Sequence, residues 1–116
     1  MHLREDRYEA ALPDLEFATE KDPAFAEAWF QLGMTLGKLG RGEEKIQAYE
    51  RAVDLRSDYV EARYNLALSL LLAGYREAAE AQVVMIKPWN PELAEKLRDI
   101  VYMIKIDPFE RKRLVQ

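Results

Sequence analysis

The 116-residue sequence predicts an all-α fold, a superhelix of stacked antiparallel helical hairpins, and two observations carry this prediction. The segment AWFQLGMTLGKLG (28–40) recurs 34 residues later as ARYNLALSLLLAG (62–74). Within each copy, apolar residues return every three or four positions, which is the period of one helix face. A single hairpin cannot bury such a face, so the copies are expected to stack into a curved array with a concave side.

Glycine marks the end of the repeated helix in both copies. Gly40 and Gly74 stand just past the last periodic apolar residue, where a left-handed C-cap needs a residue without Cβ. A second helical pattern follows each glycine, so the repeating unit is a hairpin. Its first helix is expected at about 24–39 and 59–73, and its second helix at about 42–55 and 76–86.

The same register extends backwards to the N-terminus. Residues 7–21 match the second helix of an earlier copy, although Pro13 removes a backbone donor there and should bend that helix. No first helix of this leading copy stands in the sequence. We therefore expect either that an N-terminal portion precedes these residues or that this end packs on something else.

Proline also divides the part that follows residue 86. Pro88 should end the preceding helix and leave Trp89 in a loop. Asn90-Pro91-Glu92 then supplies an N-cap, a first-turn proline and an acidic residue near the positive end of the helix dipole. Asp107-Pro108 repeats this start signal for a short helix at about 108–115, which makes about seven helices. The composition of Ile100–Ile106 leaves a strand as the alternative for that stretch.

Composition narrows the class of function. A net charge of −4 gives no general attraction to nucleic acid or to an anionic membrane. The apolar runs are far shorter than the roughly 20 residues that a bilayer span needs. The charged start MHLREDRYEA lacks the apolar core of a secretory signal, so we expect a cytoplasmic chain.

Catalytic and metal-binding constellations are missing from the sequence. Cysteine is absent, and the single histidine, His2, stands at the terminus. Ser57 and Ser69 lie outside any nucleophile-elbow pattern, and no phosphate-binding glycine loop occurs. The expectation is a chain that is not an enzyme and uses no cofactor and no metal.

The paired helices and their period resemble the tetratricopeptide repeat. The matching residues in 26–59 are Trp29, Leu32, Gly33, Leu36, Gly40, Tyr49 and Ala52, and those in 60–93 are Leu66, Ala67, Leu70, Gly74, Ala79 and Pro91. Four positions depart from the family. Lys45 stands where a small residue is usual, and Arg63 replaces an aromatic residue, while Val83 and Ile86 replace an aromatic residue and an alanine. The resemblance implies one domain with residues 1–25 as the second helix of a partial leading repeat. Two full repeats follow at 26–59 and 60–93, and 94–116 supply a capping helix and a short tail helix.

In this family the first helix of each hairpin lines the concave groove, which implies a protein-interaction module that binds a peptide or a helix of a partner protein. The implied groove residues are Glu27, Phe30, Gln31, Met34, Lys38, Glu61, Tyr64, Asn65, Leu68, Leu72, Arg98 and Tyr102, with Glu95 and Asp99 beside the last two. Phe30 and Tyr64 could equally pack on the neighbouring helix, and the glutamates could form an ordinary solvated face.

The charge of these positions bears on the partner. Family members that bind the acidic tails of heat-shock chaperones use lysine, arginine and asparagine at the groove, and here only Asn65 fits that clamp while Glu61 takes a lysine site. A carboxylate would meet repulsion from the glutamates. We therefore expect a basic or apolar segment rather than an acidic one.

The C-terminal helix offers a second surface. Apolar residues reach nearly all round it, whereas the outer side of a terminal helix in a repeat array should be polar. The candidates for a second interface are Trp89, Met103, Ile104 and Ile106. The alternative function is therefore a structural or assembly subunit that uses this end to form a homo-oligomer or to dock in a larger complex.

Overall fold

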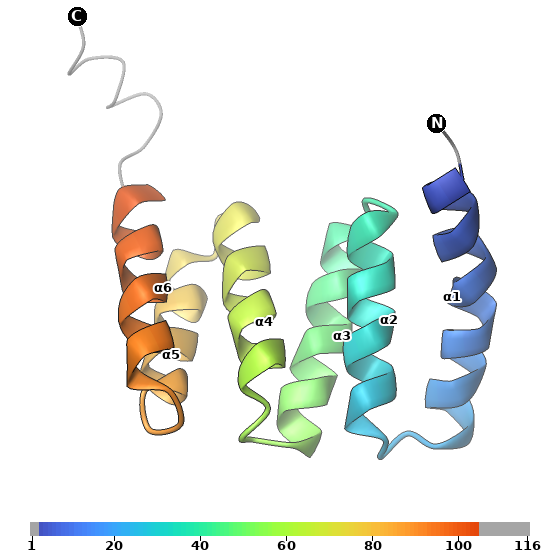
Figure 1. Ribbon diagram of the computed structural model, residues 1–116, viewed down its shortest axis with the longest axis horizontal. Helices are drawn as coiled ribbons and strands as arrows, with labels where there is room; N and C mark the ends of the chain where they lie inside the picture. Colours follow the sequence, from blue (N-terminus) through green and yellow to red (C-terminus); the bar gives the residue numbers. More distant parts are fainter. Residues whose placement is uncertain (1–2, 105–116) are drawn as a thin grey trace, which may run out of the picture.

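The computed structural model describes residues 3–104, and these form six helices without a strand (Figure 1). The helices are α1 (Leu3–Lys21), α2 (Ala26–Lys38), α3 (Gly42–Leu55), α4 (Val60–Leu72), α5 (Arg76–Ile86) and α6 (Pro91–Ile104). The all-α prediction is confirmed, and the alternative strand is wrong over residues 100–104, which belong to α6. The tail helix expected at 108–115 lies outside the described residues.

The helices form a flat array of hairpins. The helix α2 packs antiparallel against α3, and α4 packs against α5, while α3–α4 and α5–α6 contacts join successive hairpins. In Figure 1, α2, α4 and α6 lie in front, and α3 and α5 lie behind them. The described part measures 52 × 39 × 19 Å. This arrangement places the first helices of successive hairpins side by side on one face.

The glycine caps close α2 and α4 as the sequence predicts. Gly40 and Gly74 have φ angles of +76° and +92°, which only a residue without Cβ adopts at low cost. The amide of Arg41 donates to the carbonyl of Leu36 (2.9 Å), and Gly40 donates to Gly37 (3.1 Å). This pair of bonds is the Schellman motif, which satisfies carbonyls at the end of the helix. The amides of Tyr75 and Gly74 repeat it at α4.

Three other local predictions can be compared with the structure. The N-cap at Asn90 is confirmed, because its Oδ1 accepts a hydrogen bond from the amide of Leu93 (3.0 Å). The helix α5 ends at Ile86, so Trp89 lies outside a helix and 57% exposed. The helix α1 extends further towards the N-terminus than residue 7 and continues through Pro13.

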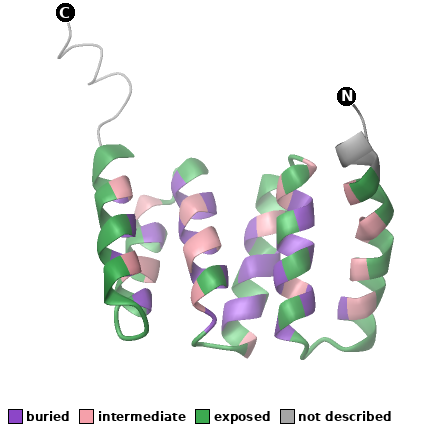
Figure 2. Ribbon diagram, viewed as in Figure 1, coloured by how far each residue is buried: buried purple, intermediate pink, exposed green. Residues whose placement is uncertain are grey.

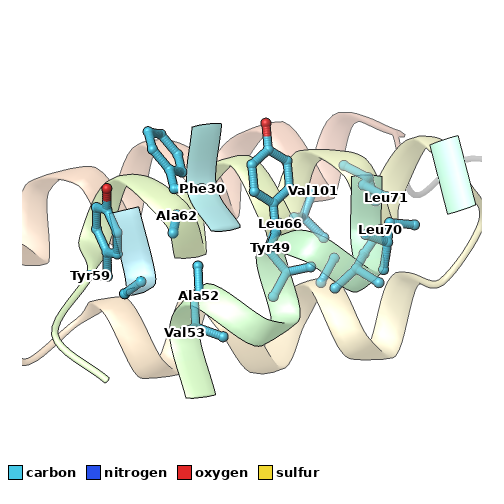
Figure 3. Packing of buried hydrophobic residues seen from close by; sticks show 13 residues of the cluster. Phe30, Tyr49, Ala52, Val53, Tyr59, Ala62, Leu66, Leu70, Leu71 and Val101 are labelled. Atoms are coloured by element: carbon cyan, nitrogen blue, oxygen red, sulfur yellow. The ribbon is translucent and has the colours of Figure 1, made fainter. Parts of the chain in front are cut away.

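The main core lies between the hairpins, where α2, α3 and α4 meet (Figure 2). The Phe30 ring packs between two tyrosine rings, with its centroid 5.8 Å from that of Tyr49 and 5.1 Å from that of Tyr59 (Figure 3). Ala52 and Ala62 are fully buried beside them. By contrast, the helical surface of α1 is mostly exposed or half-buried (Figure 2).

Candidate functional site

A pocket of about 410 Å³ opens on the face where α2 and α4 lie side by side. Its lining comes from α2 (Met34, Gly37, Lys38), α3 (Lys45, Tyr49) and α4 (Asn65, Leu68, Ser69, Leu72). Five of the twelve predicted groove residues meet here, namely Met34, Lys38, Asn65, Leu68 and Leu72. The helical spacing brings them together, since positions three and four apart share one face.

Apolar side chains of this pocket are open to solvent. Leu72 is 77% exposed and Met34 is 43% exposed, although both are large apolar side chains. Leu68 is half-buried between them and the second core cluster, and the ring of Tyr49 is buried at the pocket floor. Neighbouring exposed apolar groups gain free energy when a partner removes them from water. The pocket can therefore bind an apolar side chain.

Asn65 contributes a polar group at the centre of the α4 face. Its side-chain Nδ2 donates a hydrogen bond to the main-chain carbonyl of Glu61 (3.0 Å). Its main-chain carbonyl accepts a hydrogen bond from Ser69 Oγ (2.7 Å), so the side-chain Oδ1 is not used. With one amide hydrogen used in this way, Oδ1 and the other hydrogen are available to a ligand backbone. Asn65 can thus bind main-chain groups without regard to the ligand's side chains.

Two lysines give the pocket a positive charge. Lys38 stands in the last turn of α2, and Lys45 comes from the beginning of α3. Neither lies within 4.0 Å of a carboxylate in the part of the chain that the structure describes, where the ion pairs are Arg41–Glu44, Arg56–Asp58 and Arg98–Glu95. Lys45 was not among the predicted groove residues, although its departure from the family pattern was a signal that could have identified it.

The predicted glutamates lie at the opposite end of the same helix faces. Glu27 and Glu61 are exposed in the first turns of α2 and α4. Glu61 stands eleven residues before Leu72, which corresponds to about 16 Å along a helix at 1.5 Å per residue. The face is therefore acidic where the helices begin and basic where α2 ends.

Phe30 and Tyr64 pack largely against neighbouring helices. Phe30 is only 9% exposed and belongs to the main core, and Tyr64 is half-buried against the second core cluster. Gln31 is exposed and lines a separate pocket of about 460 Å³ between α1 and α2, together with Met34 and Lys38.

The remaining predicted residues lie on or next to α6, away from the pocket. Arg98 and Tyr102 line another pocket of about 210 Å³ between α5 and α6. Arg98 lies 3.8 Å from a carboxylate oxygen of Glu95, and Asp99 is exposed. For the second interface, Trp89 (57%), Met103 (71%) and Ile104 (42%) are exposed, whereas Ile106 lies outside the described residues.

Comparison with known proteins agrees with the repeat geometry. The model of the tetratricopeptide repeat matches residues 2–59, which is half of the chain. The chain belongs to the tetratricopeptide repeat family. No helix between residues 3 and 104 has both the length and the apolar character that crossing a membrane requires.

Two of the relatives by sequence are peroxisomal targeting signal receptors. The chain is 41% identical over 76 residues to the peroxisomal targeting signal receptor of Candida glabrata, covering 65% of this chain and 13% of that protein. It is 55% identical over 53 residues to the receptor of the same name from Eremothecium gossypii, covering 45% of this chain and 9% of that protein. Each match thus spans a small part of the relative.

One solved structure is similar over most of the tetratricopeptide array. It is the Yersinia enterocolitica type III secretion chaperone SycD in complex with a peptide of the translocator YopD, with a TM-score of 0.74 and 18% identity. The match covers 90% of this chain and 84% of that one. At this identity the similarity shows the shared fold.

Proposed function

We propose that the chain is a protein-interaction module that binds a peptide or a helix of a partner protein along the face of α2 and α4. The single observation that carries this proposal is the pocket at Met34, Asn65 and Leu72, which combines exposed apolar surface with the side-chain amide of Asn65. An apolar cleft with a few polar groups is the usual form of a binding site.

The comparisons support the same class of function. The receptors named above are receptors for a targeting signal, and SycD is described in complex with a translocator peptide. A module that binds a segment of another protein is common to these descriptions. We extend this class of function to the chain. The identity of the partner is a question for experiment, because one fold serves many partners.

The charge distribution favours a polarised ligand. A basic or apolar part of the ligand fits beside Glu27 and Glu61, where two carboxylates stand in the first turns of neighbouring helices. An acidic chaperone tail does not fit this part of the groove, because its carboxylates would face the carboxylates of Glu27 and Glu61. Cytoplasmic location and a role without catalysis belong to the same proposal.

Selection from a phage-displayed library of random dodecapeptides tests the groove. Peptides selected on the wild-type chain should bind Leu72→Asp at least about tenfold more weakly, because a charge would enter the apolar part of the pocket. Val84→Asp is the matched control, since Val84 is 70% exposed on α5 and lies outside this pocket. Failure to select any peptide, or equal binding to Leu72→Asp and wild type, would contradict the proposal.

A second candidate is the assembly role, which the exposure of α6 favours. Ile104 stands 34 residues after Leu70 and 68 after Leu36, yet it is 42% exposed whereas Leu36 and Leu70 are 4% and 5% exposed. The neighbouring Met103 is 71% exposed. Sedimentation velocity over a hundredfold concentration range distinguishes the roles: an oligomer that Ile104→Asp dissociates supports assembly, and a monomer throughout contradicts it.

A further inference from the structure

The side chain of Lys45 reaches the groove by passing over Gly37 of α2, where no side chain stands in its way. A Cβ at Gly37 would lie 2.8 Å from Cδ of Lys45, which is too close without a shift of the lysine side chain, and 3.8 Å from its Cε, which is an ordinary contact. The aliphatic stem of Lys45 therefore occupies the place of a side chain on α2. As a result, a residue of the second helix of the hairpin lines a pocket on the face of the first helices, beside Lys38.

The usual structural roles do not account for these two lysines. A lysine in the last turn of a helix often donates to its final carbonyls. Here the carbonyls of Thr35, Leu36 and Gly37 already accept backbone hydrogen bonds from Leu39, Arg41 and Gly40. No carboxylate of the described chain lies within 4.0 Å of either ammonium group. Two like charges that share one pocket repel each other and favour a negative ligand between them.

We infer that an acidic side chain of the bound segment docks between Lys38 and Lys45, next to an apolar residue on Met34 and Leu72. This inference rests on the proposed function and specifies its ligand. Charge complementarity selects the occupant: two unpaired cations face a partner that carries a carboxylate. An apolar residue of the ligand that covers Met34 and Leu72 would shield the pair from water and strengthen it.

The polar group beside the lysines suits a main chain that continues past the pocket. Asn65 commits one amide hydrogen to the carbonyl of Glu61, and it keeps Oδ1 as an acceptor for a ligand N–H. With its second amide hydrogen also available, Asn65 offers both an acceptor and a donor, which matches a peptide group of a continuing main chain. The inference therefore assigns the acidic group to an Asp or Glu side chain of a segment that continues towards Glu27 and Glu61, where its basic or apolar part lies.

The inference adds one acidic residue to the charge expectation drawn from the groove positions alone. That expectation placed only first-helix residues on the groove and therefore omitted Lys45. With Lys45 included, the groove is acidic at one end and basic at the other, so a ligand with a basic or apolar part and one acidic residue binds in a single direction.

Peptide selection on two forms of the chain gives the first test. Random dodecapeptides selected on wild type should be enriched in Asp or Glu next to an apolar residue, and those selected on Lys45→Met should lose only the acidic enrichment. Methionine keeps an apolar stem over Gly37 without the charge. Lys96→Met, an exposed position on α6 outside the pocket, is the control and should behave as wild type.

The second test measures, by fluorescence anisotropy, the affinity of one selected peptide for the wild type and for the variants. Lys45→Met should weaken the acidic peptide about 5- to 30-fold at low salt, and should leave the peptide with Glu→Gln or Asp→Asn unchanged. Gly37→Ala retains both lysines but displaces the Lys45 stem, so it should weaken the acidic peptide and spare the amide version.

Three results would overturn the inference. They are peptides without acidic enrichment, an equal loss for the acidic and amide peptides, and a loss that follows amidation of the peptide C-terminus instead of the side chain. In each of these cases peptide binding at the groove still stands. If no peptide is selected at all, the proposed function itself fails, so the two failures are distinguishable.

Discussion

The first repeat, the hairpin α2–α3, and the second repeat, the hairpin α4–α5, have the same glycine caps but fill their helix crossings differently. In the first repeat, Gly33 lets the Tyr49 ring lie against the α2 backbone, where an added Cβ would stand 2.6 Å from two ring carbons. In the second repeat, Ala67 stands at the position of Gly33, and Val83 packs against its cluster in place of the tyrosine. The crossing thus requires a suitable combined volume, and the individual residues can vary.

The junctions before the two repeats show a second substitution of this kind. Trp29 Nε1 donates to the carbonyl of Pro23 (2.9 Å), six residues earlier. Arg63, at the equivalent position, donates through Nε to the carbonyl of Ser57 (2.7 Å), also six residues earlier. Arginine and tryptophan are chemically different, yet each combines a planar group with an N–H donor. At these two junctions the hydrogen bond is kept while the side chain that supplies it changes.

Exchange of the crossing residues gives the largest expected effect. Gly33→Ala should lower the free energy of unfolding by about 2–3 kcal/mol, because its methyl group would overlap a buried ring that cannot move freely. The measurement is urea denaturation followed by far-ultraviolet circular dichroism. Tyr49→Val alone should also destabilise, because it leaves a cavity.

The double variant Gly33→Ala/Tyr49→Val reproduces the pair of the second repeat and tests the comparison directly. Its loss should be smaller than the sum of the two single losses by about 1–2 kcal/mol. Strict additivity would show that the two residues do not compensate each other, and the volume argument would then be wrong.

Loss of the buried guanidinium is expected to have the next largest effect. Arg63 is 7% exposed and also donates to Gln82 Oε1 (2.9 Å), so Arg63→Met leaves two acceptors without their donor. The expected cost is about 2 kcal/mol in thermal or urea unfolding. Trp29→Phe removes a single donor and should cost about 1 kcal/mol. If Arg63→Met proves neutral, the equivalence of the two junction bonds is refuted.

Alkaline pH should destabilise the first repeat in particular. Burial raises the pKa of Tyr49 to about 12, so the folded chain holds this phenol neutral above the pKa of the unfolded chain, near 10. The resulting stability is fully present below about pH 10 and is lost as the pH rises through about 12. Between pH 8 and 11.5 the wild type should lose about 1–2 kcal/mol through this group.

Tyr49→Phe is the control for the alkaline effect, since it keeps the ring without the ionisable hydroxyl. Its urea midpoint should fall less than that of wild type over the same pH range. Tyr59, whose pKa is also raised by burial and by Glu27, remains in both proteins and cancels from the difference. Parallel pH profiles of the two proteins would show that Tyr49 does not titrate with unfolding.

Features that depend on local chain geometry could be predicted from the sequence. The helix ends at Gly40, Gly74 and Asn90 agree with the structure because each follows from one residue's backbone or side-chain chemistry. The hairpin arrangement agrees because a period of 34 residues leaves little freedom in how helices stack. The end of α5 before Pro88 has the same local origin.

Contacts between helices were harder to predict. The family resemblance implied a groove position for Phe30 and left packing on a neighbouring helix open, and the structure places its ring in the core between Tyr49 and Tyr59. The contribution of Lys45 depends on a long side chain that crosses a neighbouring helix at Gly37, and no pattern within one helix contains that information. The binding roles of the groove residues stay predictions.

The two junction bonds also bear on the mechanics of the array. Trp29 and Arg63 each link the first helix of a repeat to the segment that precedes it, through a hydrogen bond to a carbonyl six residues earlier. The third junction has Leu97 at the equivalent position, and a leucine side chain has no donor. We therefore expect the array to bend more readily at its third joint, next to α6, than at its first two. A ligand that spans α2 and α4 would then meet a groove whose width changes little on binding.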